Sequence, residues 1–563
     1  MSIHEIETSS KFVLSSITIG VILGCIGAGM ANLFRSGINW ISSFEREILW
    51  FLPDFYFYFL TLTISAIIVH IIKKNLSGST FHGVADSVYY AHKSSDCTDI
   101  RTGLLSTLAA FVSASGGASV GQYGPLVHFG TTFGAILRKL IPFKLSSDLF
   151  IGAGVAASIS AGFGAPIAGL IFAYEVILRH YSHKFILAIA TASGVAYAIT
   201  QFIWRKSMVF DFPQYEFDLL KLILVSLIAG LIYGVVSILY MRSLFYFAAL
   251  SQRIKLGAVY KTLTAILLLS MLGVFLPEVL GLGTEAVTDI FLGNFGLGFL
   301  FLILLGKILA TSISLNFGFF GGVFSPALLI GASAGAFIAN FLMKMGIILN
   351  FEYALVIGGM AAVAGSVIGA PITMIILVIE LTGSYIYGLA SLVGLAVAVS
   401  FTQIRYGASY FDLQLLRRGI DIAEGRMGLY LRETSVVKFI QTEFITVPIH
   451  ITVGAAKKII SETGLSELVV VSSSSEFIGK VEASLLINFD AETKIEGIVD
   501  RDCIVVDHRA SLSDAMQIAA NFVGESIPVL DQERNVVIGV ISENALFAAY
   551  LDQQRAILET EKK

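Results

Sequence analysis

The chain has 563 residues, of which 56% are hydrophobic and 14% are charged, and its formal net charge is −4 at pH 7. Soluble domains are about 45–50% apolar and about 25% charged, so this composition predicts an integral membrane protein. The mean hydropathy of +0.81 agrees, and the slightly acidic balance excludes the basic surface that nucleic-acid binding needs.

Long uncharged stretches recur through the first 410 residues. The first begins at Phe12, after Glu5, Glu7 and Lys11, and shows no small-residue cleavage site. We therefore expect a spanning helix there rather than a removed signal peptide, with residues 1–12 as a cytosolic segment. Several stretches match or exceed the roughly 20 residues that a spanning helix needs. They are Phe12–Phe34, Leu222–Met241, Thr262–Pro277, Ile308–Met343 and Tyr353–Ile379.

Three blocks of the membrane part occur twice, in the same order. The first pair is "FHGVADSV" (81–88) and "GLGTEAVT" (281–288), and the second is "GQYGPLVHFGTTFGA" (121–135) and "GVFSPALLIGASAGA" (322–336). The third pair is "GAPIAGLIFAYE" (164–175) and "GAPITMIILVIE" (369–380). Repeated halves with Gly- and Pro-interrupted apolar segments indicate a transporter-like site, where helix N-termini face an anion near the midplane. Each glycine-rich turn alone is also compatible with close helix packing.

The charge content rises sharply near the C-terminal end of the chain. Residues 411–563 hold 38 of the 78 charged side chains, which are 37 Lys or Arg and 41 Asp or Glu. Only this tail reaches the charge content of a soluble protein. We therefore predict a membrane domain of about 410 residues followed by a soluble domain of about 150.

The tail also repeats an alternating α/β pattern. Residues 451–486 resemble residues 510–547, and Gly479 corresponds to Gly539. Each unit is predicted to run from a helix to an apolar strand, a turn and a second strand. The expected helices are Ala455–Ser461 and Asp514–Asn521, and the expected strands are Leu468–Val471, Ile478–Val481, Ser526–Leu530 and Val537–Ile541. The three cysteines, Cys25, Cys97 and Cys503, are too far apart to suggest a disulfide framework or a metal site.

Together, these stretches resemble the CLC family of chloride channels and chloride/proton antiporters. "VGQYGPLVHFG" is similar to the family's Gly-Lys/Arg-Glu-Gly-Pro segment, and "GGVFSPALLIG" to its Gly-x-Phe-x-Pro segment. "FGAPIAGLIFAYEV", "LGKILATSIS" and "SYFDLQLLRRG" resemble further family stretches, and the tail looks like a CBS pair. The resemblance implies an all-α polytopic domain over 13–419 with inverted halves at about 13–210 and 215–419. It also implies a cytosolic α/β CBS pair over 420–563, with modules at about 437–490 and 500–555.

The resemblance assigns an anion path to particular residues. The N–H groups around Tyr123 and Gly124 and those of Val323 and Phe324 would face the ion, and Tyr410 would supply a central hydroxyl. His82 and Gly83 fall within the family's Gly-Ser-Gly-Ile-Pro-type turn, with His82 at the serine. Phe81, Val84 and Ala85 depart from that turn. Tyr410 as an interfacial aromatic and His82 as a packing histidine remain open.

Two departures from the antiporters bear on the mechanism. Tyr123 stands where the antiporters carry the gating glutamate, and Val176 stands where a second glutamate feeds protons into the path. Glu175, directly before Val176, is interpreted as structural. A phenol ionises near pH 10, so Tyr123 cannot cycle as a carboxylate does, although it can still act as a steric gate or donate its O–H.

We therefore predict passive chloride conduction, uncoupled from protons. One alternative is an antiporter with another proton route through His82, whose side-chain type titrates near neutral pH. The other is a membrane-anchored CBS sensor whose pore is closed by Tyr123. We expect no enzyme, since no Ser–His–Asp set, metal cluster or phosphate loop has convincing spacing.

The resemblance has further implications for partners and location. They are a homodimer with one pore per subunit, membrane lipid and a small inorganic anion as partners, and no nucleic acid. The expected location is a bacterial inner membrane, with both termini cytosolic. Adenine-nucleotide binding by the CBS pair is left open, because Ala545 replaces the ribose-binding carboxylate and only Asn544 or Glu543 lies nearby to substitute.

Overall fold

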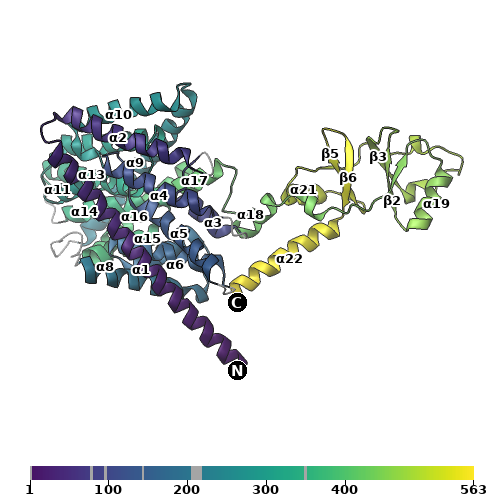
Figure 1. Ribbon diagram of the computed structural model, residues 1–563, viewed down its shortest axis with the longest axis horizontal. Coiled ribbons are helices and arrows are strands. Elements are labelled where there is room, and N and C mark those ends of the chain that lie inside the picture. The colour runs from purple at the N-terminus through teal and green to yellow at the C-terminus, as the bar shows by residue number, and fades with distance from the viewer. Residues whose placement is uncertain are drawn as a thin grey trace. The chain divides into compact units, whose positions relative to one another are not determined.

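The computed structural model describes residues 3–76, 80–93, 98–141, 145–204, 219–347 and 351–562. Cys97 and the expected boundary between the membrane halves, at 210–215, lie outside these residues. The chain divides into two compact units, Met1–Gly419 and Ile420–Lys563 (Figure 1). The division falls where the charge content of the sequence rises.

The described part of the first unit is built of helices (Figure 1). Its first half contains α1 (Ile3–Ile48), α2 (Asp54–Lys74), α3 (Val84–His92), α4 (Ile100–Ser115), α5 (Tyr123–Leu140), α6 (Ser147–Phe163), α7 (Pro166–Phe172), η1 (Ala173–Leu178) and α8 (His183–Trp204). Its second half contains α9 (Leu219–Arg253), α10 (Ala258–Phe275), η2 (Pro277–Val279), α11 (Thr284–Phe291), α12 (Leu297–Asn316), α13 (Phe324–Lys344), α14 (Glu352–Ile368), α15 (Pro371–Thr382), α16 (Tyr385–Tyr406) and α17 (Tyr410–Leu416).

Eight helices of the described residues are long and apolar enough to cross a membrane, which makes this a multi-pass membrane protein. They lie within α1, α2, α8, α9, α10, α12, α13 and the region from α16 to α17. The first of them, Ser10–Ile48, is longer than the expected Phe12–Phe34 at both ends.

Two of the long uncharged stretches are broken rather than continuous. Ile308–Met343 is interrupted between α12 and α13, and Tyr353–Ile379 between α14 and α15. Gly369 ends α14 with a left-handed φ of 78°, and Pro371 begins α15. Gly164, with a φ of 72°, and Pro166 make the same break in the first half. Glycine tolerates this conformation and proline suits the first turn of a helix, so both repeats end and restart at matching positions.

Each half contains a helix–helix contact that requires glycine. A Cβ added at Gly154 on α6 would lie 2.1 Å from the carbonyl oxygen of Gly130 on α5. A Cβ added at Gly331 on α13 would lie 2.2 Å from the carbonyl oxygen of Gly359 on α14. Small residues therefore let the backbones of each helix pair approach closely, as they do in other membrane helix pairs.

The second unit contains two three-stranded sheets, each with one parallel and one antiparallel strand pair. The elements are α18 (Gly425–Glu433), η3 (Val436–Phe439), β1 (Thr446–Pro448), α19 (Val453–Thr463), β2 (Glu467–Val471), β3 (Phe477–Glu482), α20 (Ala483–Leu486), η4 (Ile495–Gly497), β4 (Val506–Asp507), α21 (Leu512–Ala519), β5 (Ile527–Asp531), β6 (Val536–Ile541) and α22 (Glu543–Lys562). The predicted helix–strand–strand units are confirmed. The short strands β1 and β4 were not predicted, because two or three residues carry no periodic pattern.

A buried ion pair joins the two tail repeats. Lys480 Nζ lies 2.6 Å from Glu467 Oε2 and also donates to the carbonyl of Ser526, and the side chains of Lys480 and Glu467 are 5% and 8% exposed. Burial alone would raise the pKa of the Glu467 carboxyl, but bonds from Lys480 and the backbone N–H groups outweigh it, so the pKa is lowered. The stability that this pair contributes is therefore present above the ordinary pKa of a glutamate and is lost as the pH falls through the lowered value.

We expect Gly154→Ala to destabilise the first unit, because the added methyl group would overlap the Gly130 carbonyl. Overpacking of this kind costs about 1–3 kcal/mol. The measurement is thermal unfolding of the purified protein in detergent. Gly29→Ala on α1 is the matched control, because a Cβ at Gly29 meets nothing within 4 Å. Equal melting temperatures for the two variants would contradict the close-packing explanation.

Candidate anion site

The two halves meet at a pair of reciprocal backbone hydrogen bonds. Gly121 N donates to Gly322 O and Gly322 N donates to Gly121 O, each over 2.7 Å. A Cβ at Gly121 would lie 2.9 Å from Gly322 O, so glycine is required for the approach. Helices α5 and α13 begin two residues after these glycines. The bridge therefore holds the N-termini of both helices at one place.

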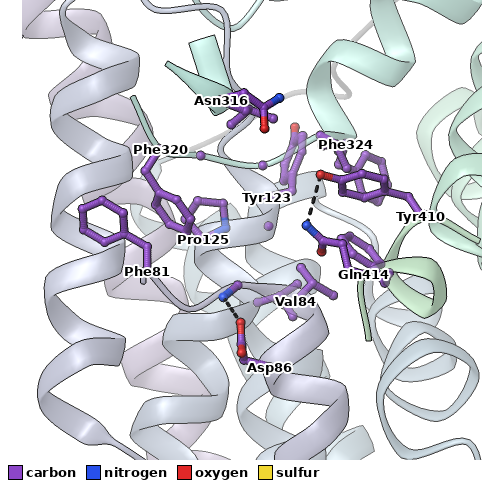
Figure 2. A pocket seen from close by; sticks show the side chains of 18 of the residues that line it. Phe81, Val84, Asp86, Tyr123, Pro125, Asn316, Phe320, Phe324, Tyr410 and Gln414 are labelled. Atoms are coloured by element: carbon purple, nitrogen blue, oxygen red, sulfur yellow. Dashed lines mark hydrogen bonds between the residues drawn. The ribbon is translucent and has the colours of Figure 1, made fainter. Parts of the chain in front are cut away.

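A cavity of about 160 Å³ lies at these N-termini, and we call it the anion cavity (Figure 2). Six of the seven residues predicted to contact an anion line it, whereas His82 does not. The lining comprises Phe81, Gly83, Val84, Asp86, Tyr123, Gly124, Pro125, Val127, Phe172, Leu315, Asn316, Phe320, Gly321, Gly322, Val323, Phe324, Tyr410, Phe411, Gln414 and Arg418.

The N-termini of α5 and α13 are not closed by side-chain caps. Neither Gln122 nor Val323, at the N-cap positions, makes a side-chain cap hydrogen bond. The first N–H groups of a helix have no partner within the helix and carry its positive dipole end. Two such ends at one cavity can bind an anion, as helix N-termini commonly do.

The α3 end of the cavity differs, because its N-terminus is capped. Gly83 N donates to Asp86 Oδ2 over 2.7 Å, so the Gly83 amide is already used. Arg418 Nη1 lies 2.7 Å from Asp86 Oδ1 and pairs with the carboxylate. Figure 2 shows Asp86 at the far end of the cavity from Tyr123. The one carboxylate in the lining is therefore neutralised by Arg418 and does not occupy the place of the missing gating glutamate.

Tyr410 presents its hydroxyl to the cavity. The amide nitrogen of Gln414 donates to Tyr410 Oη over 3.1 Å, and Figure 2 shows the hydroxyl pointing toward Tyr123. Because Gln414 supplies the hydrogen of that bond, the phenolic hydrogen can be donated to a second acceptor. Tyr410 is therefore buried in the cavity wall, and its hydroxyl can donate into the cavity.

Tyr123 forms an aromatic cluster with Phe163 and Phe324. Its ring stacks on Phe163 with a centroid distance of 3.7 Å and an interplanar angle of 16°. Phe324 lies edge-on at 5.5 Å. A Cβ at Gly162 would come within 3.3 Å of the Tyr123 ring, so the glycine makes room for it. The tyrosine is 9% exposed and forms an uncharged wall of the anion cavity.

The side chain of His82 lies in a polar cluster beside the cavity, which corrects its predicted place in the lining. Its Nδ1 lies 3.3 Å from the Tyr90 hydroxyl, and its ring centroid lies 5.8 Å from that of His128. His128 Nδ1 bonds to Ser87 Oγ over 2.8 Å. We call His82, Ser87, Tyr90 and His128 the histidine cluster. In the sequence, the turn around His82 departed most from the family pattern, which was the available signal for this difference.

Glu175 and Glu380 make equivalent contacts, because each accepts hydrogen bonds from the start of a helix in the other half. The two carboxylate oxygens of Glu175 accept from Ile372 N and Thr373 N at the start of α15, over 2.8 and 2.7 Å. Glu380 accepts from Ile167 N and Ala168 N at the start of α7, over 2.8 Å each. Each glutamate thereby caps the broken helix of the other half. The adjacent Val176 is fully buried and supplies no proton carrier.

Lys307 is a buried ionisable residue that the motif analysis did not single out. Its side chain is fully buried, and Nζ donates to the carbonyls of Val279 and Gly281 over 3.0 and 2.9 Å. A charge inside a membrane domain is expensive and marks a functional position by default. The sequence signal was a single lysine between Asp289 and Lys344 in an otherwise uncharged run.

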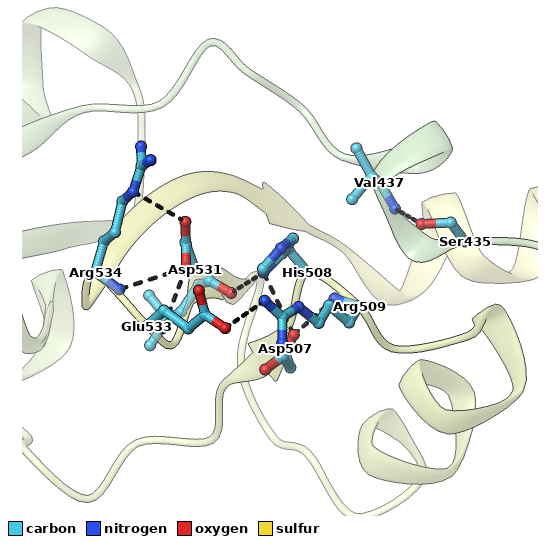
Figure 3. Close-up of polar contacts among 9 residues, drawn as sticks. Ser435, Val437, Asp507, His508, Arg509, Asp531, Glu533 and Arg534 are labelled. Carbon is cyan, nitrogen blue, oxygen red and sulfur yellow. Dashed lines mark hydrogen bonds and ion pairs between the residues drawn. The ribbon is translucent and has the colours of Figure 1, made fainter.

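Several charged side chains lie close together beside the second tail sheet (Figure 3). Arg509 pairs with Glu533 at 2.6 Å, and Arg534 lies 3.9 Å from Asp531. Ala545 N donates to Ser542 Oγ, so at the expected ribose position only a backbone amide and a methyl group are present. Nucleotide binding by the tail stays open. Among the described residues no group of three or more His, Cys, Asp or Glu side chains is arranged to hold a metal.

Comparison with protein families identifies relatives of both units. A model described as voltage gated chloride channel matches residues 61–403, which is more than half of the chain. A model described as CBS domain matches residues 495–552. These matches agree with the expected membrane family and with the CBS-like tail.

Curated relatives and solved structures extend this comparison. The H(+)/Cl(−) exchange transporter ClcA of Vibrio cholerae is 29% identical over 316 residues, which cover 54% of this chain and 66%, slightly less than two thirds, of that protein. An uncharacterized protein of Methanocaldococcus jannaschii is 27% identical over 305 residues, covering 54% of this chain and 75% of its own. A slow cyanobacterial Cl−/H+ antiporter matches with a TM-score of 0.64 and 23% identity, over 72% of this chain and 97% of its own. A CLC-type fluoride/proton antiporter matches with a TM-score of 0.61 and 22% identity, over 74% and 99%. At these identities, the structures support the fold alone.

We expect Glu175→Ala to destabilise the first unit, because the N-terminus of α15 would lose a charged cap. Hydrogen bonds to charged groups are worth about 1.5–3 kcal/mol, and Glu175→Gln should recover part of that loss. Glu380→Ala should produce a similar drop, since it caps α7 in the same way. Thermal unfolding in detergent measures all three. If Glu175→Ala left the melting temperature unchanged, the glutamate would not be a structural cap.

Proposed function

This chain belongs to the voltage-gated chloride channel (CLC) family, and from that premise we propose that it conducts chloride passively, without moving protons in exchange. The observation that carries the proposal is the chemistry at Tyr123. An anion that reaches the open ends of α5 and α13 meets a neutral phenol and not a carboxylate. A carboxylate can compete with chloride and carry a proton, whereas a phenol, which ionises near pH 10, stays neutral at pH 7.

The other charged groups around the cavity are consistent with this proposal. Asp86 is held by Arg418 and by the Gly83 amide, and both oxygens of Glu175 accept bonds from α15. Protonating either carboxylate would break these contacts, which makes both poor proton carriers. Chloride would be bound by the α5 and α13 N–H groups and by the Tyr410 hydroxyl.

Further parts of the proposal follow from the family. We propose a homodimer with one pore in each subunit, cytosolic termini and a location in a bacterial inner membrane. Lipid and a small inorganic anion would be its partners. The CBS-like tail would contribute to dimer contacts or bind an adenine nucleotide, and the absence of a carboxylate at Ala545 favours the first role.

The histidine cluster favours a second candidate function, a proton-coupled exchanger that uses histidines. His82 and His128 are adjacent, and the cluster lies next to Asp86 and Gly83 of the anion cavity. His128 is 1% exposed, and its Nε2 has no partner in the described part of the chain. An exchange function would need protons to pass from Tyr90 through His82 to His128 and then to the cavity.

The first functional prediction concerns crossed gradients of chloride and pH in proteoliposomes. We expect chloride to run down its gradient without driving protons uphill, because the carboxylates that couple the two are replaced. Uphill proton movement at a fixed ratio to chloride would contradict passive conduction.

Tyr123→Ala should raise chloride flux about tenfold, which corresponds to about 1.4 kcal/mol of barrier. Flux in the variant alone, with a silent wild type, would instead support the closed sensor.

The second functional prediction separates the two candidates with His82→Ala and His128→Gln. We expect chloride flux in both variants to stay within about twofold of the wild type, since neither side chain lines the anion cavity. Loss of proton movement with preserved chloride flux would favour the exchanger. His70→Ala on α2 is the matched control, because it removes a histidine outside the cluster.

A further inference from the structure

Three cavities follow one another through the first unit and share wall residues. Tyr123 lines both the anion cavity and a second cavity of about 70 Å³, which we call the apolar chamber. Leu282, Gly283 and Thr284 line both the apolar chamber and a third cavity of about 410 Å³, the wide cavity. The apolar chamber therefore lies against the anion cavity at Tyr123 and against the wide cavity at the turn of residues 282–284.

The apolar chamber is poor in hydrogen-bond donors. Its walls are mostly aliphatic and thioether side chains from α13, α14 and α15, such as Leu328, Met360, Leu377 and Val378. Thr382 is one of the few hydroxyls in the wall, and its Oγ1 already donates to the Val378 carbonyl over 2.7 Å. By contrast, the wide cavity carries the charged side chains of Glu45, Arg46, Glu278 and Glu285, which can hydrogen-bond to water.

Hydrogen-bond donors lie at both ends of the apolar chamber. At one end, α5 and α13 present their uncapped N-termini. At the other end, Lys307 Nζ lies behind the turn shared with the wide cavity, 3.4 Å from the position that a Cβ on Gly283 would take. The uncapped helix ends therefore favour an anion at the Tyr123 end of the chamber, while its mostly apolar walls replace little of the water that an anion loses.

We infer that the apolar chamber is a dehydration filter, so that this protein passes weakly hydrated anions in preference to strongly hydrated ones. The inference rests on the proposed anion conduction and names the substrate class of the same pathway. Narrow apolar passages oppose water and hydrated ions, so the cost of entry depends on how tightly the ion holds its water. Thiocyanate and nitrate bind their hydration water least tightly, chloride binds it more tightly, and fluoride binds it most tightly. The expected order is thiocyanate, nitrate, chloride, fluoride.

The experiment measures bi-ionic reversal potentials of the full-length protein in planar bilayers, with thiocyanate, nitrate or fluoride against chloride. We expect thiocyanate to be about tenfold more permeant than chloride in the wild type. Val378→Thr adds a hydroxyl to the chamber wall with little change in shape and should reduce this ratio several-fold. Val235→Thr makes the same change on the exposed face of α9 and should leave the ratio unchanged. Met360→Gln is a second chamber variant, which keeps the test decisive if Val378→Thr does not fold.

The outcomes distinguish this inference from the proposed function. If chloride is conducted but thiocyanate is no more permeant, the filter is wrong while passive conduction stands. The same conclusion follows if the chamber variants and Val235→Thr shift the ratio alike. If the wild type conducts no anion, the proposed function fails and the filter fails with it. If the thiocyanate-to-chloride permeability ratio falls in Val378→Thr or Met360→Gln but not in Val235→Thr, the filter is supported.

Discussion

The site depends on one constraint, which is that the uncapped N-termini of two helices from opposite halves are held at a single point. Their positive ends would repel each other without a fixed connection. The reciprocal hydrogen bonds between Gly121 and Gly322 provide that connection, and they form only because neither residue has a side chain. The remaining features of the first unit, from the broken helices to the glycine contacts, place α5 and α13 at this bridge.

The capping of helix ends divides those that can bind an anion from those that cannot. α5 and α13 carry no side-chain cap, whereas Asp86 caps α3 and Ser409 caps α17. Farther away, Glu175 and Glu380 cap α15 and α7. Side chains therefore cap the N-termini of α3, α7, α15 and α17. The N-terminal N–H groups of α5 and α13 remain available to a ligand. Tyr123 fits this pattern, because it adds an aromatic wall without adding a competing charge.

The two tail repeats are joined by a buried ion pair, by backbone hydrogen bonds such as that from Phe477 N to Asn535 O, and by a shared hydrophobic cluster. Lys480 and Glu467 each come from a strand of the first repeat; Lys480 donates to the Ser526 carbonyl, and Glu467 accepts from the N–H groups of Glu525 and Ser526, which precede β5 of the second. Removing one partner of such a pair leaves an unpaired buried charge. The two repeats thus behave as one soluble module, with its own hydrophobic clusters in each repeat.

The sequence alone determined the fold class, the internal repeats and most of the residues at the anion cavity, because these depend on local patterns. Hydrophobic periodicity and Gly–Pro helix breaks predict the helices and their repetition, whereas the cavity residues, Tyr410 among them, follow from the resemblance of the motifs to the family. The sequence could not determine which donors are already used, since that depends on how the side chains are arranged in the folded chain. Only the tertiary structure shows that Asp86 takes the Gly83 amide and that Arg418, 332 residues away, neutralises Asp86. The same holds for His82, which motif alignment assigns to the cavity but packing against Tyr90 and His128 directs elsewhere. A side chain's direction is set by the helices around it, and local sequence does not encode that arrangement.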